Sequence, residues 1–305
     1  MRIIVLGFTG YLGGHIAGQL RALGGVRLFG GGRSPAADLR VDLATADAGR
    51  LAEALADFAP DAVVNCAGAV GGDSVRLAEV NARGPAVLCA ALREAAPSAR
   101  LVHLGSAAEY GPAEHGVRVA ETAPAGPVAP YGATKLAGTL AVTSSGLDAV
   151  VLRVGNPVGP GAPSNSLPGG TADRLMRAGD TPGAVVRFGD LSAYRDFVDV
   201  RDLARAVVLA TTTTGPLPRV LNISGGRAVP IRDLVHGLVT EAGFRGRIEE
   251  AATAGSARSA GVGWQCSDIT AAHESLGWAP RYGLGDSLAV LWESVSAQAR
   301  LDAVP

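Results

Sequence analysis

A doubly wound α/β fold, with helices on both faces of a parallel sheet, is predicted from the pattern of the first half of the chain. Short apolar runs rich in β-branched residues alternate with longer amphipathic stretches, which is typical of strand–helix–strand units. The apolar runs lie at Ile3–Leu6, Val26–Phe29, Ala62–Val64, Leu101–Leu104 and Ala149–Leu152. The helical stretches are Tyr11–Leu23, Asp47–Phe58, Asp73–Ala96 and Tyr131–Ser145. Such sheets bind ligands at the carboxyl ends of their strands, so residues just after each run are the first functional candidates.

The second half of the chain is less regular and predicts a smaller lobe. Gly155–Gly170 is rich in Gly, Pro and Ser and is expected to form a long loop. Further helices are expected at Thr171–Ala178, Val200–Ala210, Ile231–Ala242 and Asp286–Ala299, and loops at Thr211–Pro218 and Ala251–Gly263. We expect a large first domain over residues 1–155, to which parts of 185–223 return, and a second lobe formed mainly by residues 156–305.

The composition predicts a protein with a sizeable core and no polyanionic partner. Hydrophobic residues make up 48% of the 305 residues and charged residues 18%, as expected for a globular chain. The formal net charge is −1 and no basic tract of five or more residues occurs, so neither nucleic acid nor an anionic membrane is an expected partner. Met1–Leu6 already predicts a strand, which leaves no room for a signal peptide, and no apolar run reaches the roughly 18 residues of a membrane helix. A soluble, cytoplasmic protein is therefore expected.

Cysteine and histidine usage gives no sign of a metal or a disulfide. The three cysteines, Cys66, Cys89 and Cys266, are odd in number, and none of them lies in a CxxC pair. The five histidines are scattered without the spacing of metal ligands. We expect reduced, mostly buried thiols and no bound metal.

A glycine-rich turn follows the first predicted strand and opens a helix. Gly7, Gly10 and Gly13 in GFTGYLG allow a tight turn and let backbone N–H groups approach a pyrophosphate at the positive end of the helix. Since 42 of the 305 residues are glycine, the triplet alone is weak evidence. The strand–turn–helix context is what favours a dinucleotide over a turn that binds no ligand.

The end of the second predicted strand favours NADP(H), with NAD(H) as the second possibility. An acidic side chain there would accept a hydrogen bond from the ribose 2′-hydroxyl, whereas a basic one would accommodate a 2′-phosphate. The chain has Gly30–Gly32 followed by Arg33 and Ser34, with no carboxylate. The alternative for Arg33 is an ordinary solvated loop arginine.

The catalytic prediction rests on the single lysine of the chain. Of the 27 basic residues, 26 are arginine, so a lysine is used only at Lys135. It follows Tyr131 by four residues in YGATK and therefore lies on the same helix face. A tyrosine pKa near 10 is too high for a base at neutral pH, and a nearby ammonium lowers it. Ser106, at the end of the fourth predicted strand, could hydrogen-bond the substrate oxygen.

Taken in order, these motifs resemble those of the extended short-chain dehydrogenase/reductases, specifically the nucleotide-sugar epimerase, dehydratase and reductase family. The matching segments are GFTGYLG at 7–13, Asp42-Leu43, NCAGA at 65–69, Asn81, GSAAEYG at 105–111, YGATK at 131–135, LRVGNPVGPG at 152–161, RDFVDVRDLA at 195–204 and LGWAPR at 276–281. The resemblance implies a Rossmann-like sheet with a smaller, discontinuous C-terminal substrate lobe. It also implies a homodimer through the helices near Asp73–Ala96 and Tyr131–Ser145.

The resemblance implies a role for each matching position. The catalytic residues would be Ser106, Tyr131 and Lys135. The residues implied to bind the cofactor are Gly7, Thr9, Gly10, Tyr11, Leu12, Gly13, Arg33, Asp42, Leu43, Cys66, Ala67, Gly68, Asn81, Tyr131, Lys135, Pro157 and Val158. Those implied to bind the substrate are Ala69, Ser106, Ala107, Ala108, Asn156, Arg195 and Arg258. Arg195 and Arg258 resemble arginines that bind a pyrophosphate through bidentate bonds. For Arg195 the alternative is a salt bridge to Asp196 or Asp199, and for Arg258 an ordinary loop arginine.

Three reactions compete within this family. The 4,6-dehydratases usually have an acidic pair directly after the catalytic serine or threonine, where this chain has Ala107 and Ala108. The GSxxEYG form looks most like reductases of GDP-4-keto-6-deoxymannose, which favours NADPH-dependent reduction of a 4-keto group on a nucleotide-linked 6-deoxy sugar. The alternatives are an NAD-dependent epimerase and a ketoreductase acting on a polyketide or antibiotic intermediate. A non-catalytic, cofactor-sensing protein could dispense with Tyr131 and Lys135, so their presence weighs against it.

Overall fold

Seven parallel strands form the central sheet of the protein. The structure, a computed structural model, describes residues 1–179, 181, 183–251 and 261–302. The strands are β1 (Arg2–Leu6), β2 (Arg27–Gly32), β3 (Leu39–Arg40), β4 (Ala62–Asn65), β5 (Arg100–Ser106), β6 (Ala149–Val154) and β10 (Val220–Ile223). They lie in the order β10-β6-β5-β4-β1-β2-β3, and every described pairing among them is parallel. This confirms the doubly wound, Rossmann-like sheet, whose strand order reverses beside β1.

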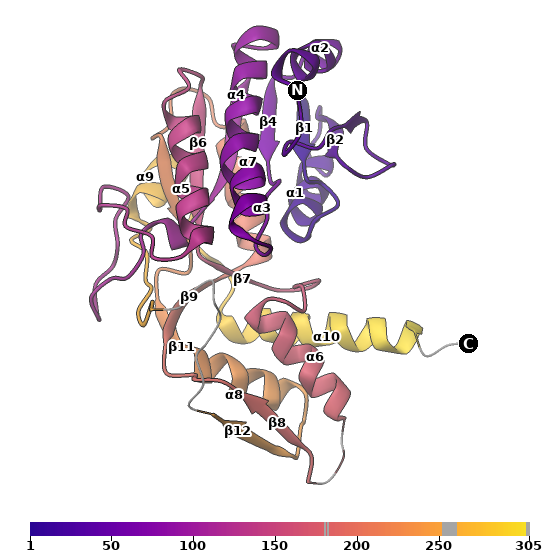
Figure 1. The fold of residues 1–305 in the computed structure, drawn as a ribbon. Coiled ribbons are helices and arrows are strands. Elements are labelled where there is room, and N and C mark those ends of the chain that lie inside the picture. The colour runs from indigo at the N-terminus through magenta and orange to yellow at the C-terminus, as the bar shows by residue number, and fades with distance from the viewer. Residues whose placement is uncertain (180, 182, 252–260, 303–305) are drawn as a thin grey trace.

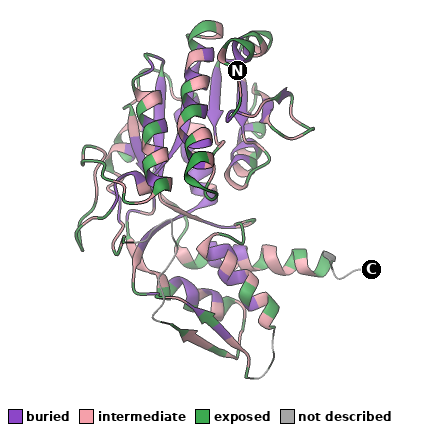
Figure 2. Ribbon diagram, viewed as in Figure 1, coloured by how far each residue is buried: buried purple, intermediate pink, exposed green. Residues whose placement is uncertain are grey.

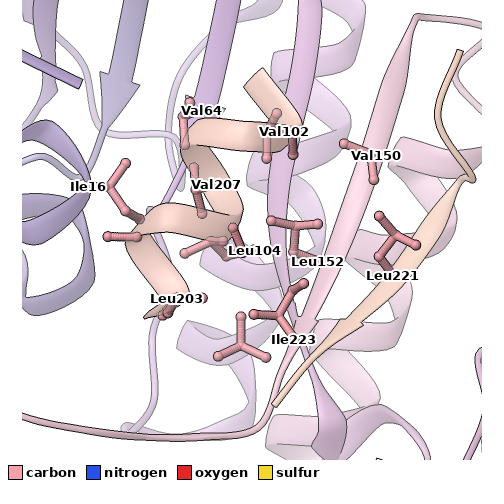
Figure 3. Close-up of a cluster of buried hydrophobic side chains, with 14 of the residues drawn as sticks. Ile16, Val64, Val102, Leu104, Val150, Leu152, Leu203, Val207, Leu221 and Ile223 are labelled. Carbon is pink, nitrogen blue, oxygen red and sulfur yellow. The ribbon is translucent and has the colours of Figure 1, made fainter. Parts of the chain in front are cut away.

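Helices cover both faces of this sheet because alternate residues of each strand point in opposite directions. On one face, α1 (Tyr11–Arg21) and α7 (Val200–Thr212) pack against Val64, Val102 and Leu152. Figure 3 shows Ile16 of α1 and the Leu203–Val207 pair of α7, one helical turn apart, facing these strand residues. On the other face lie α2 (Ala48–Phe58), α4 (Gly84–Ala95) and α5 (Pro130–Thr143). The central strands β4, β5 and β6 are accordingly buried along their whole length (Figure 2).

Most of the second half of the chain, apart from α7, β10 and α9 (Thr270–Leu276), forms a smaller lobe beside the carboxyl edge of the sheet (Figure 1). Its core is built from α6 (Leu167–Ala178), α8 (Ile231–Glu241) and α10 (Leu284–Asp302), together with β8 (Val185–Phe188), which pairs with β12 (Arg247–Glu250). A three-stranded sheet of β11 (Ala228–Pro230), β9 (Tyr194–Asp199) and β7 (Asn156–Val158) lies between this core and the central sheet. Between β12 and α10, the chain returns to the first core through α9 (Thr270–Leu276) and Trp278.

Several local expectations are wrong in detail. Gly155–Gly170 is not one loop, because it contains β7 and the first turn of α6; β7 forms by pairing with β9, a partner far away in the sequence. The stretch Asp73–Ala96 is not one regular helix, since a π-helical segment at Glu79–Arg83 separates α3 (Ser74–Ala78) from α4. The second strand was expected to end at Phe29, but β2 continues through its glycines to Gly32. A Cβ on Gly31 would lie 2.5 Å from the side chain of Leu6.

Two general expectations can also be compared with the structure. Cys66, Cys89 and Cys266 are free thiols, as expected, and the last two are buried. Among the helices of the described chain, none combines the length and the apolar character needed to cross a bilayer.

Candidate active site

The parallel sheet brings most of the predicted site residues to one edge. Gly7 directly follows β1, Arg33 follows β2 and Cys66 follows β4. Ser106 is the last residue of β5, and Asn156, the first residue of β7, lies two residues after the end of β6. All these strands run in the same direction, so their carboxyl ends meet at the edge that faces the smaller lobe.

The turn after β1 has space only for glycine at two positions. Gly7 has φ +78°, a conformation that residues with a Cβ rarely adopt, and its N–H donates to the Gly31 carbonyl at 2.8 Å. Gly10 caps α1, and its N–H donates to the Gly7 carbonyl at 2.9 Å. A Cβ on Gly13 would lie 2.1 Å from the same carbonyl oxygen. The first turn of α1 therefore stays close to the strand end and leaves its amino terminus open toward a ligand.

The other residues of this turn differ in what they can offer a cofactor. Thr9 is exposed in the turn, two residues before α1 begins. The Tyr11 hydroxyl donates to the Gly159 carbonyl at 3.5 Å, so its ring contacts the loop after β7. The side chain of Leu12 packs against the core, which leaves its backbone for any contact with a ligand.

A cavity of about 250 Å³ lies at the ends of β2 and β3, lined by Arg33, Arg40, Val41 and Asp42. Both arginines are exposed, and neither forms an ion pair with another described residue. The Asp42 carboxylate accepts the N–H of Ala44 at 3.1 Å. Leu43, which the resemblance implied to bind the cofactor, has its side chain in the core beneath. Sequence reasoning missed Arg40, because a two-residue strand gives no periodic signal.

Two buried asparagines hold the loop after β4. Asn65 accepts the N–H of Ala67 at 3.1 Å through Oδ1. Asn81, in the π-helical segment, accepts the N–H of Ala69 at 2.9 Å and donates Nδ2 to the Ala69 carbonyl at 2.8 Å. A Cβ on Gly7 would lie 3.0 Å from the Ala67 nitrogen. The loops after β1 and β4 are therefore in close contact at the switch point of the sheet.

The side chain of Lys135, in α5, approaches the loop after β4. It is 6% exposed, and its ammonium donates to the Leu104 carbonyl in β5. The Nζ atom lies 4.0 Å from the point where a Cβ on Gly68 would be. Burial lowers the pKa of Lys135, and the negative charge of Glu109 opposes that shift. A buried ammonium is thus placed at the predicted cofactor loop.

Tyr131 and Ser106 lie at two segments that pack together. Tyr131 is the second residue of α5, and the following residue, Gly132, approaches so closely that a Cβ on it would lie 2.4 Å from the Ala108 carbonyl. Ala108 belongs to the 3₁₀ turn Ala107–Glu109 that follows Ser106. The Ser106 Oγ accepts the N–H of Ala108 at 3.2 Å, so one of its lone pairs is engaged and its hydroxyl proton can be donated elsewhere.

Glu109 is a buried carboxylate in this turn that sequence reasoning did not include in the site. Its Oε1 accepts the N–H of Ser106 at 2.7 Å, and its Oε2 forms an ion pair with the Arg153 Nε at 2.8 Å. Its spacing of three residues from Ser106 is the signal of a capping box, which could have indicated the contact.

The predicted substrate residues at the lobe side form a second polar group. Asn156 donates Nδ2 to the Asp196 carbonyl at 3.1 Å and to the Gln265 Oε1 at 2.6 Å. Gln265 was not among the predicted residues, because the sequence between β12 and α9 matches no periodic pattern. The next residue of β7, Pro157, is half-buried, whereas the side chain of Val158 is fully buried in the lobe core.

Arg195 is 6% exposed and has no acidic partner among the described residues. Its Nη1 donates to the Tyr194 carbonyl at 2.7 Å, and burial lowers its pKa. The alternative of a salt bridge to Asp196 or Asp199 is not what the structure shows, since Asp199 pairs with Arg201 and Asp196 accepts backbone N–H groups. Arg258, the other predicted pyrophosphate ligand, lies outside the described residues.

Comparison with known proteins decides the family. The model of the NAD dependent epimerase/dehydratase family matches residues 3–224. The chain belongs to this family. It is 37% identical over 308 residues to dTDP-6-deoxy-L-talose 4-dehydrogenase (NAD(P)(+)) of Kitasatospora kifunensis, with 97% of this chain and 96% of that protein covered. It is 27% identical over 312 residues to GDP-6-deoxy-D-mannose reductase of Pseudomonas aeruginosa, with 96% and 97% covered.

A solved structure gives the same picture of the fold. MoeE5 in complex with UDP-glucuronic acid and NAD superposes with a TM-score of 0.84 at 27% identity, over 98% of this chain and all of that chain. The resemblance to the nucleotide-sugar epimerase, dehydratase and reductase family is therefore confirmed, together with a fold that binds nicotinamide cofactors.

Proposed function

We propose that this chain reduces the 4-keto group of a nucleotide-linked 6-deoxy sugar with NADPH. The observation that carries the proposal is the position of Lys135. Its buried ammonium lies beside Gly68 at the carboxyl edge of the sheet, one helical turn from Tyr131. The relatives support the substrate class, because one is a 4-dehydrogenase of a dTDP-linked 6-deoxy sugar and another is a reductase of a GDP-linked one.

The residues present fit a dinucleotide. The close approach of Gly13 to Gly7 lets α1 start beside the end of β1, with Gly10 exposed at its amino terminus, where backbone N–H groups can bind a pyrophosphate. At the adenosine end, the cavity between Arg33 and Arg40 offers two guanidinium groups without a described acidic partner. Two arginines suit a 2′-phosphate better than a 2′-hydroxyl, which supports NADP(H) over NAD(H).

The proposed chemistry follows from three side chains. A bound nicotinamide would supply the hydride for the carbonyl carbon. The Ser106 hydroxyl, whose oxygen already accepts the Ala108 N–H, donates to the carbonyl oxygen and stabilises the charge that develops there. Tyr131 donates its phenolic proton to the resulting alkoxide oxygen. Lys135 lowers the pKa of Tyr131 by stabilising the phenolate that remains.

The substrate side favours a diphosphate over a flat polyketide. A buried guanidinium without an acidic partner is costly unless it binds an anion, and Arg195 is such a group among the described residues. We propose that Arg195 and Arg258 bind the pyrophosphate, with Asn156 and Ala69 nearer the sugar. A natural-product ketone without phosphate would leave Arg195 unpaired.

A dehydratase is disfavoured by the turn after Ser106. Ala107 and Ala108 are apolar, and the carboxylate of Glu109 is fully engaged with Ser106 and Arg153. No acid for removing water is left in that turn. The family also contains epimerases, so NAD-dependent epimerisation is the second candidate for this chain.

Turnover assays distinguish these reactions. We expect NADPH to be consumed with GDP- and dTDP-4-keto-6-deoxy sugars, one equivalent for each sugar reduced, and NADH to be used less well. Inversion of a 4-hydroxyl without net cofactor consumption would instead identify an epimerase. Consumption only with a ketone that has no phosphate would identify the natural-product alternative.

The assembly and the compartment stay predictions. We propose a homodimer through the outer faces of α4 and α5, where Leu140 is 58% exposed. Sedimentation velocity would measure its mass. We also expect a cytoplasmic protein whose partner is its small-molecule substrate.

A further inference from the structure

Glu109 occupies a position where a carboxylate is costly. Its side chain is 0% exposed, and both oxygens are used, one by the Ser106 N–H at 2.7 Å and one by Arg153 at 2.8 Å. Removing an ion pair from water is costly, and an apolar pair of similar volume is often as stable or more so. Stability alone therefore does not explain this pair.

The surrounding chain is shaped to admit the carboxylate. A Cβ on Gly105 would lie 2.8 Å from the Glu109 Oε1 and 2.7 Å from the side chain of Val151, so a larger residue at 105 would displace it. On the other side, the guanidinium of Arg153 lies 4.4 Å from the centre of the Tyr110 ring. The Tyr110 hydroxyl in turn donates to Asn222 at 2.7 Å. Residues of β5, β6 and β10 thus surround the ion pair and hold it in place.

The Glu109 carboxylate acts on both Ser106 and Lys135 of the candidate catalytic group. Through Oε1 it fixes the backbone of Ser106, while the Ser106 Oγ caps the same turn. Its negative charge also raises the pKa of Lys135, against the burial that lowers it. Glu109 therefore connects Ser106 and Lys135, which come from different elements.

Few other ionisable groups surround Lys135 in the described chain. Burial raises the pKa of Cys66, on the β4 side, to about 12. Burial lowers the pKa of His103, in β5, well below its usual range. Both are therefore neutral near pH 7. Apart from Tyr131 on the same helix, Glu109 is the remaining group, and its Oε2 forms an ion pair with the Arg153 Nε at 2.8 Å.

We propose that Glu109 is a positioning residue of this active site, whose buried carboxylate orients Ser106 and stabilises the ammonium form of Lys135. This inference extends the proposed ketoreductase function and assumes the same catalytic residues. It assigns a role to a side chain that need not touch substrate or cofactor. It also explains why a buried charge is kept where an apolar residue would fit.

The single lysine of the chain allows a direct test. Protein labelled with ¹³C at the lysine Cε, produced with a lysine-free tag, gives one side-chain signal, and its titration reports the pKa of Lys135. In Glu109→Gln the amide oxygen can still accept the Ser106 N–H, but the charge is gone. We expect the Lys135 signal to titrate at lower pH than in the wild type, and kcat to fall about tenfold or more.

Two further variants separate charge from folding. Glu121→Gln is the matched control, because Glu121 is a half-buried glutamate that accepts the Asn222 N–H at 2.7 Å and has no contact with Ser106. It should leave the Lys135 titration and kcat unchanged. Glu109→Gln alone leaves Arg153 buried without its partner, so the double variant Glu109→Gln/Arg153→Met should recover thermal stability while the Lys135 signal and kcat remain altered.

The outcomes separate this inference from the proposed function. If the wild type turns over neither nucleotide sugar, the proposed function fails, yet the Lys135 titration still decides the role of Glu109. An identical titration in the wild type and in Glu109→Gln overturns the inference. So does a double variant that recovers kcat together with stability, because Glu109 would then act only through folding.

Discussion

At the scale of single residues, the environment of Lys135 determines how the site can work. Burial disfavours its charged form, whereas the Leu104 carbonyl and the charge of Glu109 favour it. In the proposed reaction the ammonium would stabilise the phenolate that Tyr131 becomes when it transfers its proton. In the proposed function Tyr131 acts by transferring a single proton, and Arg33 and Arg40 act by their charge.

Replacing Tyr131 by phenylalanine removes the proton donor and little else. We expect kcat to fall by about 100- to 10,000-fold, the usual contribution of a general acid, while the Kd for NADPH changes less than about twofold. Stopped-flow reduction and fluorescence titration measure the two quantities. Tyr282→Phe is the control, since Tyr282 is exposed and its ring, which stays in place, contacts Arg201. Near-normal turnover in Tyr131→Phe would remove the proposed mechanism.

Arg33 and Arg40 should determine the preference for NADPH. In Arg33→Ala and Arg40→Ala we expect the Kd for NADPH to rise about tenfold each, because a charge-assisted bond to the 2′-phosphate is lost. The Kd for NADH should stay the same. Arg50→Ala, an exposed arginine on α2, is the matched control. Equal effects on both cofactors would show that these side chains do not recognise the 2′-phosphate.

At the scale of elements, the contact between β1 and α1 shapes the cofactor turn. A helix can start this close to a strand only where the facing residues lack a Cβ, as Gly13 does opposite Gly7. The same helix also contains glycines that serve no such contact. Gly18, for example, is exposed and would meet nothing within 4 Å if a Cβ were added.

Alanine at these two glycines should therefore have opposite effects. Gly13→Ala places a Cβ 2.1 Å from the Gly7 carbonyl, so the helix must shift. We expect the free energy of unfolding in urea to fall by about 1–3 kcal/mol and NADPH binding to weaken. Gly18→Ala should raise the free energy of unfolding by about 0.5–1 kcal/mol, because alanine is the better helix former. A harmless Gly13→Ala would contradict the close approach.

At the scale of the whole molecule, Asp196 joins segments that are far apart in the sequence. It lies in β9, and its carboxylate accepts the N–H of Ser267 at 2.8 Å and of Arg227 at 3.4 Å. Its main-chain carbonyl accepts a hydrogen bond from Asn156 of the candidate site. Burial raises the pKa of Asp196 to about 6, although these N–H groups oppose the shift.

This raised pKa predicts a pH dependence of stability. The folded state holds the Asp196 proton more tightly than the unfolded state, whose pKa is about 4. The resulting stabilisation is complete at low pH and is lost as the pH rises to about 6. Asp196→Asn has no such loss. We therefore compare the free energy of unfolding of Asp196→Asn with that of the wild type. The variant's value minus the wild-type value should increase from about pH 4 to about pH 6, by on the order of 2 kcal/mol.

Urea unfolding at several pH values measures this difference. Asp190→Asn serves as the control, because hydrogen bonds from Ser192 lower the pKa of Asp190, which is exposed. The free energy of unfolding of Asp190→Asn minus that of the wild type should decrease, not increase, as the pH rises. A flat difference for Asp196→Asn would show that Asp196 is ionised equally well in the folded and unfolded states.

The sequence by itself determined five strands of the sheet, the glycine turn and the placement of Tyr131 and Lys135 on one helix, because these depend on local periodicity and on spacings within one element. The family prediction was confirmed for the same reason, since its motifs are short and ordered along the chain. Only the tertiary structure decided that Arg40 lies beside Arg33, that Gln265 binds Asn156, and that Glu109 pairs with Arg153. These contacts join residues on different elements, and their energies depend on burial and on distance, neither of which a one-dimensional pattern contains.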